Sequence, residues 1–250
     1  MNETIQDFIK LAHFAQKIER FSKGIINNIE NDRSTIPTKT FNAYQKIIIR
    51  FFDPYTLTEA IKKTIVKRYD EHKMSQILRF MQQPNIMDFT QKEEASKSLQ
   101  ASQAMQHFFT ELQTSPPSEQ RKHLIESIDK TIGSSALVID MQMTLFQAIA
   151  WGLRNTNPNT QGITQKQLQQ ASIEMEAQMR QQVPQQIWMS MLFAYKEVSD
   201  ETLQSYLTLN QSTEGQLTAN FIRTVYSDMY QNTTKQLQYA LEAEFTQTHP

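Results

Sequence analysis

Apolar residues recur along this chain at spacings of three and four, which is the spacing of one face of an α-helix. The first example is an apolar stripe over residues 4–22, which predicts a single helix there. No run of alternating apolar and polar residues, the pattern of a half-buried strand, occurs in the sequence. The whole pattern predicts about ten helices of mixed length, so the expected fold class is all-α, an irregular multi-helix bundle.

Four Thr-x-x-Glu/Gln sequences predict where helices begin. In such a capping box the threonine hydroxyl accepts a hydrogen bond from the third backbone N–H, and the Glu or Gln side chain accepts from the threonine N–H. Each box is followed by apolar residues at helical spacing. We therefore expect helix starts at Thr56, Thr90, Thr164 and Thr213, the last three helices extending to about residues 113, 183 and 244.

Proline and glycine predict several helix ends. Asp53-Pro54 should end a helix that carries Phe41 to Phe51, Pro84 a short helix over residues 74–81, and Gly133 a helix that carries Leu124 to Ile132. Pro184 should kink or divide the helix that starts at Thr164, although the apolar pattern resumes at residue 187.

Polar and proline-rich stretches predict the breaks between helices. Loops are expected over residues 27–37 and 155–162, and Ser199 should cap a short helix over residues 200–209. Ser115-Pro116-Pro117 is the clearest break, and a serine N-cap followed by proline is a favoured helix start.

Residues 135–153 form the most apolar segment. A helix that is apolar on most sides belongs in the middle of a bundle, so the helices over residues 164–198 and 213–244 are expected to wrap it. The segment also contains Asp140, Gln142, Thr144 and Gln147, which makes it too polar for lipid without partners. No transmembrane segment is therefore expected.

The domain organisation predicted from this pattern is one helical domain over residues 1–250. No clean linker divides it, although the proline break allows two packed halves, 1–114 and 115–250. A short helix precedes a long one in each half, which hints at a degenerate internal duplication.

Charge is unevenly distributed although the net charge is only −1. Residues 1–100 hold 16 Lys/Arg against 12 Asp/Glu, whereas residues 101–250 hold 9 against 14. This basic excess is small beside that of nucleic-acid-binding domains, so nucleic acid is not the expected partner. It is compatible with an anionic membrane surface or an acidic partner, and it includes Lys62, Lys63, Lys67, Arg68 and Lys73.

No motif for catalysis or for cofactor binding is present. The chain has no cysteine, its five histidines show no Glu-x-x-His or His-Glu-x-x-His spacing, and no glycine-rich phosphate loop or Gly-x-Ser-x-Gly sequence occurs. No catalytic residue, metal site or cofactor is therefore predicted.

Two candidates for a site come from unusual side chains. Asp140 is the one acid in the most apolar helix and is a candidate buried acid, the alternative being an acid at the edge of solvent or bonded internally. Met141, Trp188, Met191 and Tyr195 are candidates for an apolar pocket. Such residues also fill helical cores, or lie on a helix that docks onto a partner.

One segment resembles a known family. The sequence Tyr195-x-x-Val198-Ser199-Asp200-x-x-Leu203-x-x-Tyr206, followed by Ser212-x-x-Gly215, is similar to the C-terminal part of a bacterial family of uncharacterised all-helical proteins, usually exported to the periplasm. The resemblance is strongest over residues 188–215. An earlier Phe-x-x-Ser-Pro-x-Gly segment of that family is matched at Phe80 and Pro84 only, with Gln83 and Ile86 at the serine and glycine places. The family has no assigned activity, so the resemblance implies a fold and a compartment.

These observations give one leading function and two alternatives. The leading hypothesis is a non-enzymatic interaction or binding protein of the bacterial cell envelope, with a protein partner. The alternatives are a helical carrier of an apolar small molecule or lipid, and an enzyme with a dispersed active site. The expected location is periplasmic if a leader was removed and otherwise cytoplasmic, since no signal peptide is visible at Met1.

Overall fold

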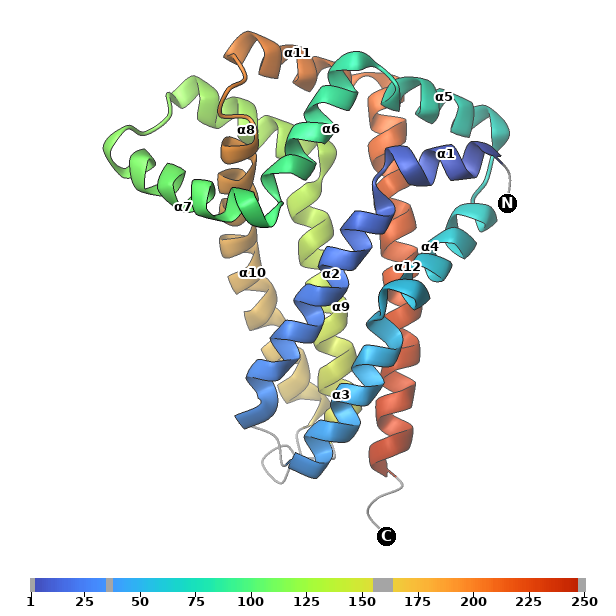
Figure 1. The fold of residues 1–250 in the computed structure, drawn as a ribbon. Coiled ribbons are helices and arrows are strands. Elements are labelled where there is room, and N and C mark those ends of the chain that lie inside the picture. Colours follow the sequence, from blue (N-terminus) through green and yellow to red (C-terminus); the bar gives the residue numbers. More distant parts are fainter. Residues whose placement is uncertain (1–2, 35–37, 155–163, 247–250) are drawn as a thin grey trace. The chain divides into compact units, whose positions relative to one another are not determined.

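The computed structural model describes residues 3–34, 38–154 and 164–246 (Figure 1). These residues form twelve α-helices and one short 3₁₀-helix, η1, without a strand, which confirms the all-α prediction. The helices are α1 (Glu3–Leu11), α2 (Phe14–Glu30), α3 (Thr38–Phe52), α4 (Pro54–Lys67), α5 (Glu71–Met81), α6 (Pro84–Ser96), α7 (Leu99–Thr114), α8 (Glu119–Ile132), α9 (Ser134–Leu153), α10 (Gln165–Ala194), α11 (Asp200–Gln211) and α12 (Thr213–Thr246), with η1 (Asn31–Ser34) after α2.

The chain divides into two compact units. Unit 1 comprises residues 1–69, 139–178 and 224–250, and unit 2 comprises residues 70–138 and 179–223. The division falls within α9, α10 and α12, and not at the proline break after residue 114.

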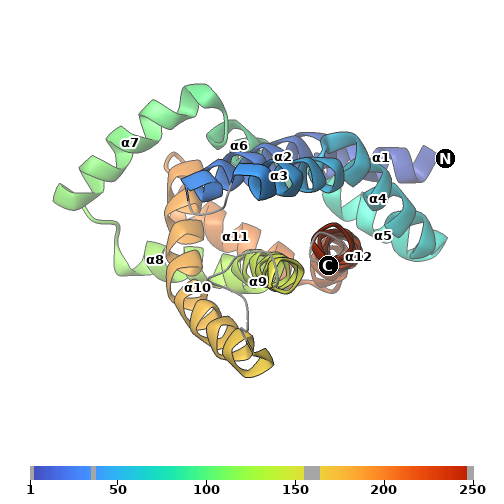
Figure 2. The same cartoon turned by 90° about the horizontal axis from the view of Figure 1, so that it is seen from below.

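Unit 1 has an aromatic core. Helix α2 packs against both α3 and α4 (Figure 2). Tyr230 of α12 lies with its ring centroid 5.4 Å from that of Phe21 and 5.9 Å from that of Phe52. Close approach of α9 to α12 requires Gly152, because a Cβ there would lie 2.5 Å from the Cβ of Leu241.

The first predicted helix is divided in the structure. Its break is at His13, which adopts the left-handed conformation with φ 52°, so α1 ends at Leu11 and α2 begins at Phe14. Histidine is one of the residues that tolerates this conformation, but neither proline nor glycine marks the break in the sequence. The predicted loop from residue 27 is also wrong at its start, since α2 continues to Glu30.

Only one of the four predicted capping boxes is formed. Thr164 accepts from the N–H of Gln167 at 3.3 Å, and its own N–H donates to the Gln167 side chain at 2.8 Å. Thr56 and Thr90 lie inside α4 and α6, which begin at prolines. Thr213 is the first residue of α12, and Ser212 caps that helix.

Where a predicted helix start is wrong, a stronger start signal determines where the helix begins. The Asp53 carboxylate accepts from the N–H groups of Tyr55 and Thr56, and Pro54 occupies the first turn of α4. An Asp cap followed by proline fixes the helix start before the threonine is reached. In the same way Ser118 caps α8 by accepting from the N–H of Arg121, whereas Ser115 follows the end of α7.

The other predicted boundaries that fall on described residues have mixed outcomes. The cap at Ser199 and the helix end at Gly133, which has φ 78°, are confirmed. Helix α10 continues through Pro184 without being divided. The predicted loop over residues 155–162 lies outside the described residues.

Helix α9 is less enclosed than predicted. Only 22% of its most apolar stretch is buried, and the buried residues follow one narrow stripe, Ser135, Ile139, Met143, Ala148 and Gly152. The low burial of α9 does not support the prediction of a central helix that its neighbours wrap. Among the described residues α9 is the one helix long and apolar enough to cross a membrane by length and composition, and the absence of a transmembrane segment stays a prediction.

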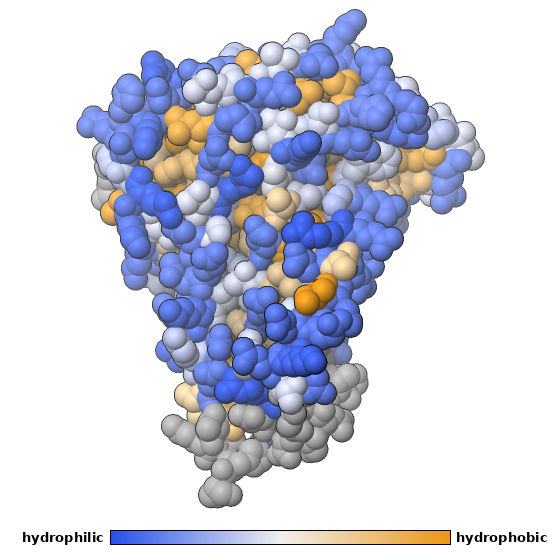
Figure 3. Space-filling view, turned by 180° about the vertical axis from the view of Figure 1, so that it is seen from behind, coloured by the Kyte–Doolittle hydropathy of each residue, from blue (hydrophilic) through white to orange (hydrophobic). Residues whose placement is uncertain are grey.

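Exposed large apolar residues are few. Figure 3 shows one face of the molecule, on which hydrophilic residues predominate and hydrophobic residues form small groups. Among the described residues the large apolar side chains classed as exposed are Ile49, Tyr55, Val66, Met87, Ile173 and Tyr239.

Candidate functional site

The segment that carries the family resemblance forms the junction of α10 and α11 in unit 2. Helix α10 ends at Ala194, a turn follows, and α11 begins at Asp200. The Ser199 hydroxyl accepts from the N–H of Thr202 at 3.2 Å and so satisfies one of the free N–H groups at the start of α11. A turn of five residues, 195–199, therefore connects the end of α10 to the start of α11.

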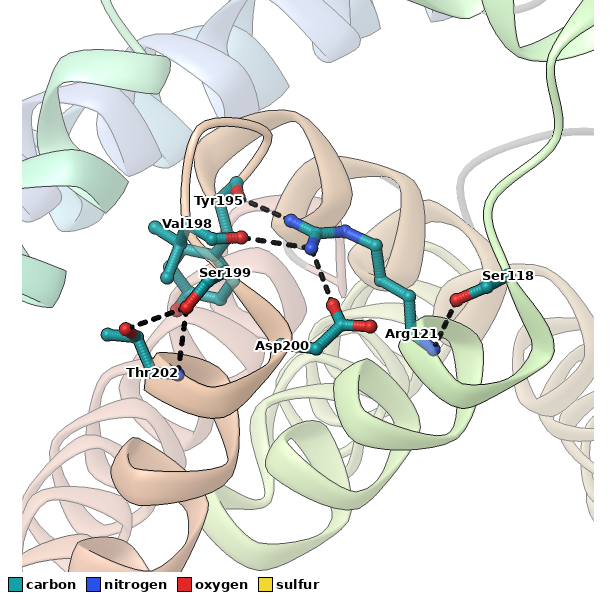
Figure 4. Close-up of polar contacts among 7 residues, drawn as sticks. All are labelled: Ser118, Arg121, Tyr195, Val198, Ser199, Asp200 and Thr202. Carbon is teal, nitrogen blue, oxygen red and sulfur yellow. Dashed lines mark hydrogen bonds and ion pairs between the residues drawn. The ribbon is translucent and has the colours of Figure 1, made fainter.

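Arg121 of α8 binds this junction (Figure 4). Its guanidinium donates to the carbonyl oxygen of Tyr195 at 2.6 Å, to that of Val198 at 2.9 Å and to the Asp200 carboxylate at 2.7 Å. Both carbonyls lie in the turn between α10 and α11, and that of Tyr195 also accepts from the N–H of Val198 at 2.8 Å. The Arg121 side chain is 17% exposed, so these bonds form largely out of water.

The side chain of Tyr195, unlike its carbonyl, belongs to an aromatic cluster. The Phe89 ring of α6 stacks on Tyr206 of α11 with centroids 3.8 Å apart, and meets Tyr195 edge-on at 5.0 Å. The Tyr195 hydroxyl donates to the carboxylate of Glu93. Three helices are thus joined through one buried tyrosine.

The tyrosines of this cluster hold their protons strongly. Burial raises the pKa of Tyr195 well above its usual value, and the Glu93 carboxylate raises it further. Burial also raises the pKa of Tyr206, with Glu93 again contributing. In unit 1, burial raises the pKa of Tyr230. Such groups serve as hydrogen-bond donors and are poorly suited to act as bases or nucleophiles near neutral pH.

Alkaline pH should therefore destabilise the protein. Above about pH 10 the unfolded chain releases its tyrosine protons while Tyr195, Tyr206 and Tyr230 keep theirs, so the free energy of unfolding falls as pH rises, by up to about 1.4 kcal/mol per pH unit for each tyrosine. Urea unfolding between pH 8 and 10.5 measures this slope. Tyr206→Phe should reduce the slope, and Tyr55→Phe, which removes an exposed hydroxyl, is the control; equal slopes in both variants would contradict the argument.

The remaining residues of the motif also have structural explanations. Val198, Leu203 and Tyr206 are buried in unit 2. Ser212 accepts from the N–H of Gly215 at 3.1 Å and caps α12. Gly215 approaches α11 so closely that a Cβ would lie 2.5 Å from the Leu209 carbonyl oxygen. The motif thus specifies a helix–turn–helix arrangement.

The predicted site residues fall in two different units. Asp140 is exposed and lies off the buried stripe of α9, so it is not a buried acid, and the alternative of an acid at the edge of solvent fits. Met141 is half-buried in unit 1. Met191 and Tyr195 are buried in unit 2, and Trp188 is half-buried there with a buried Nε1 that has no acceptor among the described residues. The apolar pocket stays a prediction.

Sequence reasoning missed Arg121 and Glu93. Arg121 contacts carbonyls 74 and 77 residues further along the chain, and Glu93 accepts from a hydroxyl 102 residues away. No local spacing signals such contacts. Within the described residues no group of three or more His, Cys, Asp or Glu side chains is placed to hold a metal ion.

The roles found at the α10–α11 junction are capping, packing and close backbone approach, which unrelated helical proteins can reach independently. The family resemblance accordingly stays a prediction. Comparisons with protein-family models, with curated proteins and with solved structures found no match to this chain.

Proposed function

We propose that this chain is a non-enzymatic protein-binding protein of the bacterial cell envelope, and that α7 is the helix that contacts the partner. The observation that supports the proposal is the apolar stripe of α7. Met105, Phe108, Phe109 and Leu112 share one face, and none of the described side chains of α7 is buried.

The spacing of this stripe is typical of an amphipathic helix that binds a partner protein. Residues at i, i+3, i+4 and i+7 are the anchors of amphipathic helices that bind in apolar grooves of partner proteins. Phe108 already contacts Phe193 of the same unit at 5.6 Å, which holds α7 in place. Phe109 and Leu112 remain partly exposed. Covering apolar side chains of this size with a partner would contribute favourably to the free energy of binding.

The exposed surface of α7 outside the stripe also supports a protein partner. It carries neutral side chains such as Gln103, Gln106 and Gln113. A helix that binds nucleic acid or an anionic membrane would present lysines or arginines there, and α7 has neither. The bacterial envelope as the place of action is supported by the family resemblance of the α10–α11 junction.

Polar substitutions in the stripe should abolish partner binding. In Phe109→Ser/Leu112→Ser two anchors are lost, each worth about 1.5–3 kcal/mol when fully buried, so affinity should fall by roughly a hundredfold or more. The measurement is quantitative co-purification of envelope proteins from the source bacterium after chemical crosslinking, with circular dichroism to verify that each variant is folded.

The matched control is Gln106→Ser/Gln113→Ser, which makes the same number of changes on the exposed polar face of α7. We expect the control to retain the partner that the stripe variant loses. Retention of the same partner by both variants would exclude α7 as the contact, and the absence of any reproducible partner of the unaltered protein would refute the proposed function.

A further inference from the structure

Unit 1 contains a groove between α4 and α12. It has a volume of about 550 Å³, within the usual range of ligand sites. Its lining comes mainly from successive turns of these two helices: Phe51, Tyr55, Thr56, Glu59, Ala60, Lys63, Thr64, Lys67, Met229, Asn232, Thr233 and Gln236.

The floor of the groove is closed. Thr64, Met229 and Thr233 are all buried. The Thr64 hydroxyl donates to the carbonyl of Ala60 at 2.9 Å, and the Thr233 hydroxyl lies 3.9 Å from the Met229 sulfur. The hydroxyls of the floor therefore interact within their own helices. A ligand would be bound by the side chains of the two walls of the groove, on α4 and α12.

The α4 wall carries two unpaired cations. Lys62 donates to Glu59 at 2.8 Å and Arg68 donates to Asp228 at 2.5 Å, so these two cations are neutralised. Lys63 and Lys67 are exposed, lie one helical turn apart, and have no partner in the part of the chain that the structure describes. This wall therefore attracts two negative charges.

The α12 wall carries two unpaired amides. Asn232 and Gln236 also lie one turn apart, are exposed, and make no hydrogen bond with the described residues. An amide side chain both donates and accepts, which suits the N–H and C=O groups of a peptide backbone. One wall is thus suited to acidic side chains and the other to a main chain.

The length of the groove along α4 fits a peptide segment in extended conformation. From Tyr55 to Lys67 the groove follows α4 over about 18 Å, the length of five or six extended residues and more than a small dicarboxylate spans. Alternate side chains of an extended peptide lie about 7 Å apart on one side, close to the 5–6 Å that separates side chains one helical turn apart. Alternate acidic residues would therefore meet Lys63 and Lys67.

We propose that this groove binds an acidic peptide segment in extended conformation. Two alternate carboxylates pair with Lys63 and Lys67, and the peptide backbone bonds to Asn232 and Gln236. Two free cations beside Glu59 and Asp228 are too few for nucleic acid, which needs several phosphate contacts. The groove belongs to unit 1 and the α7 stripe to unit 2, so a negative result for one proposal leaves the other standing.

The probe is a fluorescein-labelled peptide of alternating glutamate and threonine, measured by fluorescence anisotropy against the whole chain. Its counterpart with glutamine in place of glutamate should bind roughly tenfold or more weakly, because the pairing with both lysines is lost. Binding of the acidic peptide should also weaken as salt is raised, since both lysines are exposed.

Variants assign the binding to the groove. Lys63→Gln/Lys67→Gln should weaken binding of the acidic peptide by roughly tenfold, and Asn232→Ala/Gln236→Ala by several-fold. Lys10→Gln/Lys166→Gln changes the charge of unit 1 equally at exposed positions and should leave the affinity unchanged.

Three results would overturn the proposal. Equal affinity for the glutamate and glutamine peptides would remove the charge argument. Equal weakening by the two lysine double variants would remove the assignment to the groove. Competition by glutarate at the same concentration as the unlabelled acidic peptide would identify a site for small dicarboxylates.

Discussion

Replacing Arg121 with alanine should lower the free energy of unfolding by about 2–4 kcal/mol, one of the two largest effects that we expect in this protein. The guanidinium bonds to two backbone carbonyls and one carboxylate while only 17% of the side chain is exposed. Its removal takes this donor away from the carbonyls of Tyr195 and Val198 in the turn between α10 and α11 and leaves Asp200 without its cation. Denaturant unfolding followed by circular dichroism measures the loss.

Two comparisons separate the carbonyl bonds from the ion pair. Lys122→Ala removes the neighbouring cation of α8, which pairs with an exposed Glu119, and should change stability by less than about 1 kcal/mol. Asp200→Asn removes the ion pair and leaves the carbonyl bonds, so its effect should lie between the two. If Arg121→Ala and Lys122→Ala have the same effect, Arg121 does not hold the junction.

The helices could be predicted because helix formation depends on the spacing of apolar residues that are close in sequence. An apolar stripe and the residues that begin and end a helix depend on neighbours in sequence, so the all-α class, the end of α8 and the bounds of α11 are close to expectation. The start of α4 shows the limit of this reasoning, because Asp53-Pro54 and Thr56 compete within four residues. The aspartate cap with its proline prevails.

The contents of the junction could not be predicted in the same way. Which face of α9 is covered depends on the path of other helices, so Asp140 could not be recognised as exposed from its apolar neighbours. Arg121 is one of three Lys or Arg residues on α8, and its local sequence does not distinguish its role from that of Lys122 beside it. Partners separated by more than 70 residues leave no local pattern.

Gly215→Ala should have the second large effect, and its sign distinguishes two physical arguments. Helix propensity alone favours alanine over glycine by about 1 kcal/mol, so the substitution would stabilise α12. In the structure, however, a Cβ at Gly215 would lie 2.5 Å from the Leu209 carbonyl oxygen and 2.7 Å from the Asn210 Cα. Both are backbone atoms, which cannot move without shifting the end of α11.

We therefore expect Gly215→Ala to destabilise the protein by about 1–3 kcal/mol, measured by denaturant unfolding. Gly24→Ala is the matched control, because Gly24 lies on the exposed face of α2 and a Cβ there would meet nothing within 4 Å. That variant should be more stable by about 1 kcal/mol. Opposite signs for the same chemical change would show that the close packing of α11 on α12 requires the glycine of the motif. A gain in stability from both substitutions would mean that the junction relaxes and that Gly215 has another role.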